Sequence, residues 1–120
     1  MREIEFRAFV KDKEKIFDVK TIDFSYRFIT FEEENKPTDT MRMLDQVELM
    51  QYTGLKDNSG TKIFEGDIVS FDEKEWGSKY IEVVKWDYSL LDLRKNDYKQ
   101  WCEVIGNIYD NPELLGENNG

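Results

Sequence analysis

The side chains that could carry chemistry in this chain are almost all carboxylates. The sequence contains 26 Asp and Glu residues, one cysteine and no histidine. The absence of histidine removes the commonest general base and metal ligand, and it rules out a Ser-His or Cys-His nucleophile. A zinc site would need several N or S ligands, which the sequence does not supply. A hard-cation site and a pair of hydrolytic carboxylates are the chemistries that residue counting leaves open.

The single cysteine, Cys102, lies between Trp101 and Glu103 in an apparent strand, with no Lys, Arg or His beside it to lower its pKa. We interpret Cys102 as a buried structural thiol. One cysteine cannot form an intramolecular disulfide, and this favours a reducing compartment, the cytoplasm.

A cluster of turn residues, Asp57-Asn58-Ser59-Gly60, superficially resembles a calcium loop. An EF-hand loop starting at Asp57 would need Gly at its sixth position and Glu at its twelfth, where this chain has Lys62 and Ile68. The cluster is therefore interpreted as a plain β-turn, in which Gly60 takes a positive φ angle.

Further turn residues flank this cluster on both sides. Gly54 is expected to open the loop, and Gly66 is expected to allow a sharp bend before the next strand. Asp67 fits a bend in which its side chain bonds nearby main-chain N–H groups better than it fits a metal or catalytic pair. We accordingly predict structural roles for all of these residues, no catalytic or metal-binding residue and no cofactor, so the protein is not expected to be an enzyme.

The overall charge is strongly acidic, with a formal net charge of −9 and a pI near 4.6. Because the lysines and arginines are scattered singly, a nucleic-acid partner is disfavoured. The acidic groups Glu32-Glu33-Glu34 and Asp72, Glu73 and Glu75 are interpreted as solvated loops or as a contact surface for a basic partner. No stretch approaches the ~20 apolar residues of a membrane span.

The aromatic residues divide into two classes by their surroundings. Trp86 and Trp101 lie in regular strand patterns and are core candidates. Trp76, in a charged loop, and Tyr88, beside Asp87, are expected to be exposed. Exposed aromatic residues among charges are typical of protein-binding hot spots, so Trp76 and Tyr88 are candidate partner-binding residues together with Asp72, Glu73 and Glu75.

The elements that must position these residues are predicted to be short strands. Residues 3–8 alternate charged and apolar side chains and are expected to pair with residues 16–19, and residues 21–31 indicate a second hairpin that turns at residues 25–27. We predict an N-terminal β-hairpin region over 1–31, an acidic connector over 32–46, a small β-barrel or sandwich over 47–115 and a polar tail over 116–120. Asn111, Pro112 and Glu113 predict a single helical turn carrying Leu114 and Leu115.

Several strings of this sequence are similar to the YopX family of phage and prophage proteins. They are Arg2–Phe9, Tyr52-Thr53-Gly54-Leu55-Lys56-Asp57, Gly60, Ile63–Val69 and Cys102–Leu115. These strings occur in the same order as in the family and span nearly the whole chain. The resemblance implies a mostly β architecture with an SH3-like small barrel in the C-terminal part, a phage or prophage origin and a host bacterial cytoplasm. It implies no particular activity.

These observations favour a non-catalytic adaptor that binds another phage or host protein through acidic loops and exposed aromatic residues. A homo-oligomer is also compatible with the strand edges of such a barrel. The alternative hypothesis is a small barrel that handles nucleic acid, or an acidic mimic of DNA, and the net charge of −9 opposes direct binding of nucleic acid.

Overall fold

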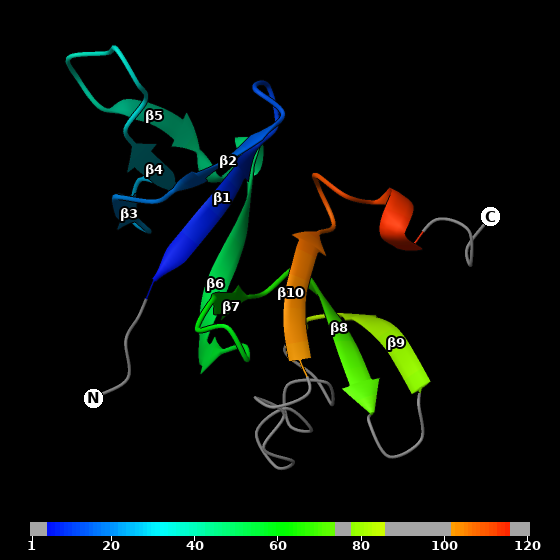
Figure 1. Cartoon of the computed structure of the whole chain (residues 1–120). Coiled ribbons are helices and arrows are strands. Elements are labelled where there is room, and N and C mark those ends of the chain that lie inside the picture. The colour runs from blue at the N-terminus through cyan, green and yellow to red at the C-terminus, as the bar shows by residue number, and fades with distance from the viewer. Residues whose placement is uncertain (1–4, 74–77, 86–101, 116–120) are drawn as a thin grey trace. The chain divides into compact units, whose positions relative to one another are not determined.

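The computed structural model of the chain describes residues 5–73, 78–85 and 102–115 (Figure 1). In these ranges the protein is mostly β, as predicted. The strands are β1 (Phe6–Val10), β2 (Lys15–Asp18), β3 (Thr21–Asp23), β4 (Phe28–Phe31), β5 (Thr40–Met43), β6 (Val47–Lys56), β7 (Lys62–Phe64), β8 (Asp67–Glu73), β9 (Ser78–Val83) and β10 (Cys102–Asn107). A short 3-10 helix, η1 (Leu44–Gln46), precedes β6, and the predicted helical turn is present over 113–115.

The described residues form two compact units, which we call the N-terminal unit (residues 5–51) and the C-terminal unit (residues 52–73, 78–85 and 102–115). The division falls inside β6, whose residues 47–51 pair with β1 and whose residues 52–56 pair with β7. The range 32–46, expected to be a connector, contains β5 and η1, because Thr40–Met43 pairs in register with β4.

The first sheet of the N-terminal unit contains β2, β1 and the first half of β6. The predicted hairpin joins β1 and β2, with Ala8 opposite Phe17 and Val10 opposite Lys15. The period-2 alternation of β1 places Ala8 and Val10 in the core, where both are fully buried.

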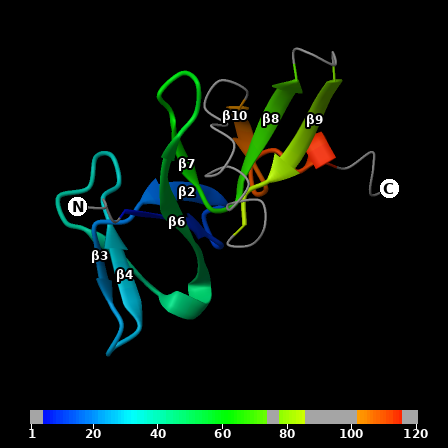
Figure 2. The same cartoon turned by 90° about the horizontal axis from the view of Figure 1, so that it is seen from below.

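The second sheet of this unit has the order β3-β4-β5, and Figure 2 shows β3 and β4 side by side. The buried faces of the two sheets share one core, in which Ile29 and Phe31 of β4 meet Ala8, Val10 and Val47, with Phe17 packed against them. The second predicted hairpin, between β3 and β4, is confirmed. Its turn covers residues 24–27, one residue earlier than expected, so Phe24 belongs to the turn and not to a strand.

The C-terminal unit combines the β6–β7 hairpin with a three-stranded antiparallel sheet of order β10-β8-β9. Its core contains Ile63, Val69, Phe71, Val84 and Cys102. The SH3-like barrel stays a prediction. The sequence also predicts short strands over 90–94 and 98–102. Residues 90–94 and 98–101, and the core candidates Trp86 and Trp101, lie outside the described residues.

In the described ranges, no helix has the length and apolar character needed to cross a membrane.

Candidate functional site

The polar residues of the strings that resemble the YopX family bind backbone groups of the fold, and Asp57 shows this most clearly. Asp57 is 1% exposed. One of its carboxylate oxygens, Oδ1, accepts hydrogen bonds from the backbone N–H groups of Ser59 and Thr61, both at 2.9 Å. The other, Oδ2, accepts the backbone N–H of Val104 in β10, also at 2.9 Å. Asp57 therefore closes its own turn and ties that turn to a strand 47 residues away in sequence.

The predicted turn glycines adopt the backbone angles that require glycine. Gly54, Gly60 and Gly66 have φ angles of 87°, 84° and 90°, a region that residues with a Cβ atom rarely adopt. At Gly54 the pairing of β6 with β7 shifts in register, which marks a β-bulge. Gly60 lies in the loop between β6 and β7, and Gly66 lies in the bend between β7 and β8.

Asp67 is buried and bonds to main chain, as predicted. Its Oδ2 accepts the backbone N–H of Phe64 at 2.7 Å, across the bend at Gly66. A buried carboxylate is tolerated where N–H groups solvate it, and this geometry explains the acid without invoking catalysis.

Asn107, at the end of β10, and Asn111 form a second polar turn. The sequence pattern singled out Asn111 for the helical turn alone and did not single out Asn107. Asn107 Oδ1 accepts the backbone N–H groups of Tyr109 and Asp110, and Asn111 Oδ1 accepts the backbone N–H of Asn107. A Cβ atom on Gly106 would lie 2.5 Å from Asn111 Oδ1. The signal in the sequence is the repeated Asn beside Gly and Pro, which is typical of side chains that bond their own backbone.

Cys102 is buried, as predicted. Burial, and secondarily the negative charge of Asp57, raises the pKa of the Cys102 thiol to about 12. The thiol is therefore protonated at neutral pH and is a poor nucleophile.

Of the residues predicted to bind a partner, the structure describes only two, and only through their backbone. Asp72 and Glu73 belong to β8 and pair with Lys79 and Ser78 of β9. The prediction that these two acids lie in a loop is therefore wrong. The strand extends because both residues keep the antiparallel register of Ile68–Phe71. Trp76, Glu75 and Tyr88 lie outside the described residues.

The exposed apolar side chains of the N-terminal unit form the surface that sequence reasoning missed. Met41 and Met43 of β5 lie opposite Thr30 and Phe28 of β4, on the sheet face turned away from the buried Ile29 and Phe31. The β3–β4 turn next to this row carries Phe24, 69% exposed, and Tyr26, 75% exposed. We call Phe24, Tyr26, Phe28, Met41 and Met43 the outer patch.

The turn at the outer patch is held by a local hydrogen bond, in which Asp23 Oδ1 accepts the backbone N–H of Tyr26 at 2.8 Å. Arg27 takes a φ angle of 60° at the end of the turn, and its carbonyl accepts the N–H of Leu44. The turn expected at residues 25–27 predicts that Phe24 lies on a strand, on the same side as Ile22. That expectation is wrong because the strand ends at Asp23.

The acidic segment after β4 is ordered by ion pairs. Glu33, whose side chain is only 12% exposed, contacts Lys13 Nζ at 2.7 Å and Lys36 Nζ at 2.6 Å, and it accepts a hydrogen bond from Thr40 Oγ1 at 2.7 Å. Lys13 first, then Lys36 and Thr40, lower the pKa of Glu33 from its ordinary 4.5 to about 2. Glu33 is thus a structural anchor and not part of a uniformly solvated acidic loop.

Within residues 5–73, 78–85 and 102–115, no group of three or more Cys, His, Asp or Glu side chains could hold a metal ion.

Comparison with known proteins gives a family and a fold. The family model described as YopX protein matches residues 5–116. The crystal structure of protein EF1440 from Enterococcus faecalis is similar to this chain, with 25% sequence identity and a TM-score of 0.60, over 96% of this chain and 99% of that one. No curated protein matches the chain. Because the family model spans nearly all of the sequence, this protein belongs to the YopX family.

Proposed function

We propose that this protein is a non-catalytic binding module of phage or prophage origin, which attaches to another protein in the host bacterial cytoplasm through the outer patch. The observation that carries the proposal is the exposure of Phe24, Tyr26, Met41 and Met43, together with the pairing of Met43 with Phe28, the first residue after the turn that carries Phe24 and Tyr26. Large aromatic side chains with few rotatable bonds are the residues that dominate protein interfaces, and methionine adapts to irregular apolar partners. The partner surface is accordingly apolar at its centre.

The buried polar groups in the rest of the described chain have structural roles, and this supports a binding function over a catalytic one. The buried acids Asp57 and Asp67 accept backbone N–H groups, and Cys102 is a protonated core thiol. None of these groups needs a substrate to account for its place. A homo-oligomer through the same patch would be an apolar self-contact, and the experiment below distinguishes it.

The test is affinity capture from lysate of the host bacterium, with and without nuclease, using the wild-type chain and the double variant Phe24→Ala/Tyr26→Ala. Ile81→Ala/Ile105→Ala is the matched control, because these two residues are exposed apolar side chains of the C-terminal unit. We expect one protein to be retained after nuclease treatment by wild type and control, with at least a tenfold loss in the patch variant.

Four further outcomes distinguish the outer patch from the other binding sites and partner classes. Equal capture by patch variant and wild type would remove the outer patch from the proposal. Loss of the partner with Trp76→Ala or Tyr88→Ala would instead assign binding to the residues predicted from sequence. Capture that disappears with nuclease would favour the nucleic-acid alternative, and a concentration-dependent dimer of the purified wild type that the patch variant lacks would favour self-association.

A further inference from the structure

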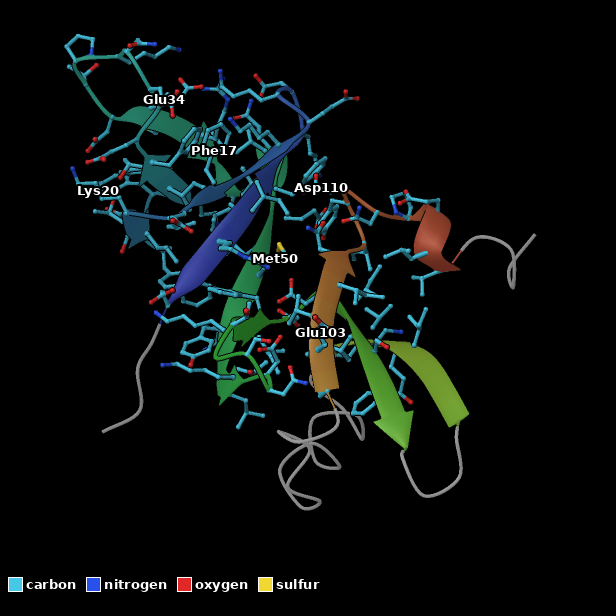
Figure 3. The ribbon with its side chains drawn as sticks, viewed as in Figure 1. Phe17, Lys20, Glu34, Met50, Glu103 and Asp110 are labelled. Carbon is cyan, nitrogen blue, oxygen red and sulfur yellow. The ribbon has the colours of Figure 1, made fainter. Side chains whose placement is uncertain are left out.

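A cleft of about 980 Å³ lies in the N-terminal unit, away from the residues of the outer patch. One wall is β2 with its flanking residues from Lys13 to Lys20, and the other is the segment 32–36. β2 is an edge strand, since it pairs only with β1 in the sheet of which it is part. The cleft therefore follows the edge of a sheet, and Figure 3 labels Phe17, Lys20 and Glu34 in this region.

The hydrogen-bond phase of the β1–β2 pair shows which backbone groups point into the cleft. The N–H of Val19 donates to the carbonyl of Phe6, so Phe6 and Val19 form a hydrogen-bonded pair. In an antiparallel ladder such pairs recur at every second residue. Ala8 with Phe17 and Val10 with Lys15 are then also hydrogen-bonded pairs, and the N–H and C=O groups of Ile16 and Asp18 point away from β1.

In the edge strand β5 of the same unit, side chains bond the backbone groups that point away from the sheet. The N–H of Leu44 donates to the carbonyl of Arg27, which turns the backbone of Met41 and Met43 outward. Gln46 Oε1 accepts the N–H of Met43 at 2.9 Å, and the Arg42 guanidinium donates to the carbonyl of Met41 at 2.8 Å. Proteins commonly cover edge strands in such ways to prevent pairing. In the part of the chain that the structure describes, no side chain covers Ile16 or Asp18 in this way.

The opposite wall is fastened to both ends of β2. Glu33 binds Lys13, just before the strand, at 2.7 Å. Glu32 binds Lys20, just after the strand, at 3.2 Å, and Lys20 also contacts Asp39. These ion pairs hold the segment 32–36 across from the strand edge and leave the cleft between them.

We propose that an extended segment of a partner protein adds to β2 as a new antiparallel strand inside this cleft. The proposal goes beyond the proposed function, because it adds a second site that holds a protein partner through its backbone. The segment exchanges hydrogen bonds with the backbone of Ile16 and Asp18, which supply two donors and two acceptors. Because the wall 32–36 faces the strand edge, the cleft admits a single strand and not the edge of a second folded sheet.

The side chains of β2 define the chemistry of that segment. Lys15 and Phe17 share one face of the strand, and Ile16 and Asp18 share the other. Among the described residues, neither Lys15 nor Asp18 makes an ion pair; Lys15 instead lies 5.3 Å from the ring centre of Phe17. A complementary antiparallel strand carries a base opposite Asp18, apolar side chains opposite Phe17 and Ile16, and an acid opposite Lys15.

The probe for the test is an acetylated and amidated peptide of sequence Val-Arg-Val-Val-Glu, which runs from opposite Val19 to opposite Lys15. It is titrated to millimolar concentration into ¹⁵N-labelled full-length protein. We expect the amide resonances of Ile16 and Asp18 to shift most and their hydrogen exchange to slow. The outer patch resonances, from Phe24 and Met41 for example, should remain in place.

Two N-methylated peptides with identical side chains separate strand addition from contact by side chains alone. Methyl groups on the Arg and the fourth residue occupy the N–H groups that would pair with Asp18 and Ile16, so binding should fall at least tenfold. Methyl groups on the first and third residues point away from β2 and should leave binding within about twofold. Asp18→Lys should weaken binding of the original peptide. A second peptide with Glu in place of Arg should bind this variant about as well as the original peptide binds the wild-type protein.

The proposal is overturned if the two methylated peptides bind alike, or if no shift occurs at Ile16 and Asp18. It is also overturned if the shifts centre on another surface. If the peptide fails while Phe24→Ala/Tyr26→Ala still loses the captured protein, only the strand addition is wrong. If the peptide binds as expected while that double variant retains its partner, the outer patch is wrong and the cleft stands.

Discussion

At the scale of single residues, the buried acids of the strings that resemble the YopX family accept hydrogen bonds from backbone N–H groups. Asp57 accepts three such groups from two separate parts of the C-terminal unit, and Asp67 accepts one across a bend. A hydrogen bond to a charged acceptor stabilises more than a neutral one, and a buried N–H left without a partner is costly. Residues of this kind can be characteristic of a family without touching any ligand.

We predict that Asp57→Asn destabilises the protein by about 1–3 kcal/mol. The amide can keep one oxygen for Ser59 and Thr61, but its NH₂ group then faces the N–H of Val104, so a buried donor meets a donor. Urea unfolding followed by tryptophan fluorescence measures the change. Asn58→Ala, an exposed neighbour, is the control and should stay within about 0.5 kcal/mol; an equal loss in both would contradict the role of Asp57.

We predict that Gly106→Ala costs about 1–3 kcal/mol through contact with Asn111. The new methyl group would lie 2.5 Å from Asn111 Oδ1 and 2.9 Å from its Cβ, so the Asn111 side chain must move and release the N–H of Asn107. Thermal unfolding gives the cost. In the background of Asn111→Ala the same glycine substitution should cost less, and additive effects of the two changes would argue against this explanation.

At the scale of elements, ion pairs organise a segment that composition alone would leave solvated. Residues 32–36 contain three consecutive acids, yet Glu33 is largely covered and bound by two lysines. Surface ion pairs are individually weak, but several contacts converging on one carboxylate fix a single geometry. The same pairs define one wall of the cleft beside β2.

We predict that Glu33→Gln lowers stability at neutral pH and that the difference from wild type disappears in acid. The folded pKa of Glu33 is depressed to about 2 from an ordinary 4.5, so its contribution is complete above the unfolded pKa. It is lost as the pH falls from about 4.5 to about 2. Urea unfolding of both proteins across this range measures it, and a difference that did not change with pH would show that the charge of Glu33 is not what stabilises the segment. Glu34→Gln is the control.

At the scale of the whole molecule, the net charge of −9 disfavours the binding of nucleic acid. A protein of this charge repels a phosphate backbone unless basic residues are gathered on one surface. The described basic residues Lys13, Lys36, Lys20 and Arg42 are each paired with a carboxylate.

We expect no binding of fluorescein-labelled single-stranded DNA or RNA by anisotropy at low salt. A basic single-strand binding protein of similar size serves as the positive control. Affinity that falls steeply with added salt would contradict the expectation and revive the nucleic-acid alternative.

The sequence by itself determined the elements whose signals are local. Alternation over residues 3–8 indicated a first strand, which the structure places at Phe6–Val10. Turn chemistry specified the loop after β6 and the bend before β8, and Asn-Pro-Glu specified the last helical turn. It also predicted that Asp57, Gly60, Gly66 and Asp67 serve turns, because side chains that bond adjacent backbone and glycines with positive φ act over a few residues.

Only the tertiary structure decided the features that depend on contacts between distant residues. The bond from Val104 to Asp57, the anchoring of Glu33 by Lys13 and the pairing of β5 with β4 join segments far apart in sequence. The outer patch emerged because the strand ends at Asp23 and leaves Phe24 in a turn, and the open edge of β2 emerged from the phase of its pairing with β1. The local sequence pattern indicates which side chains alternate along a strand. Which face of that strand is buried, and whether its edge stays unpaired, depends on the distant segments that pack against it.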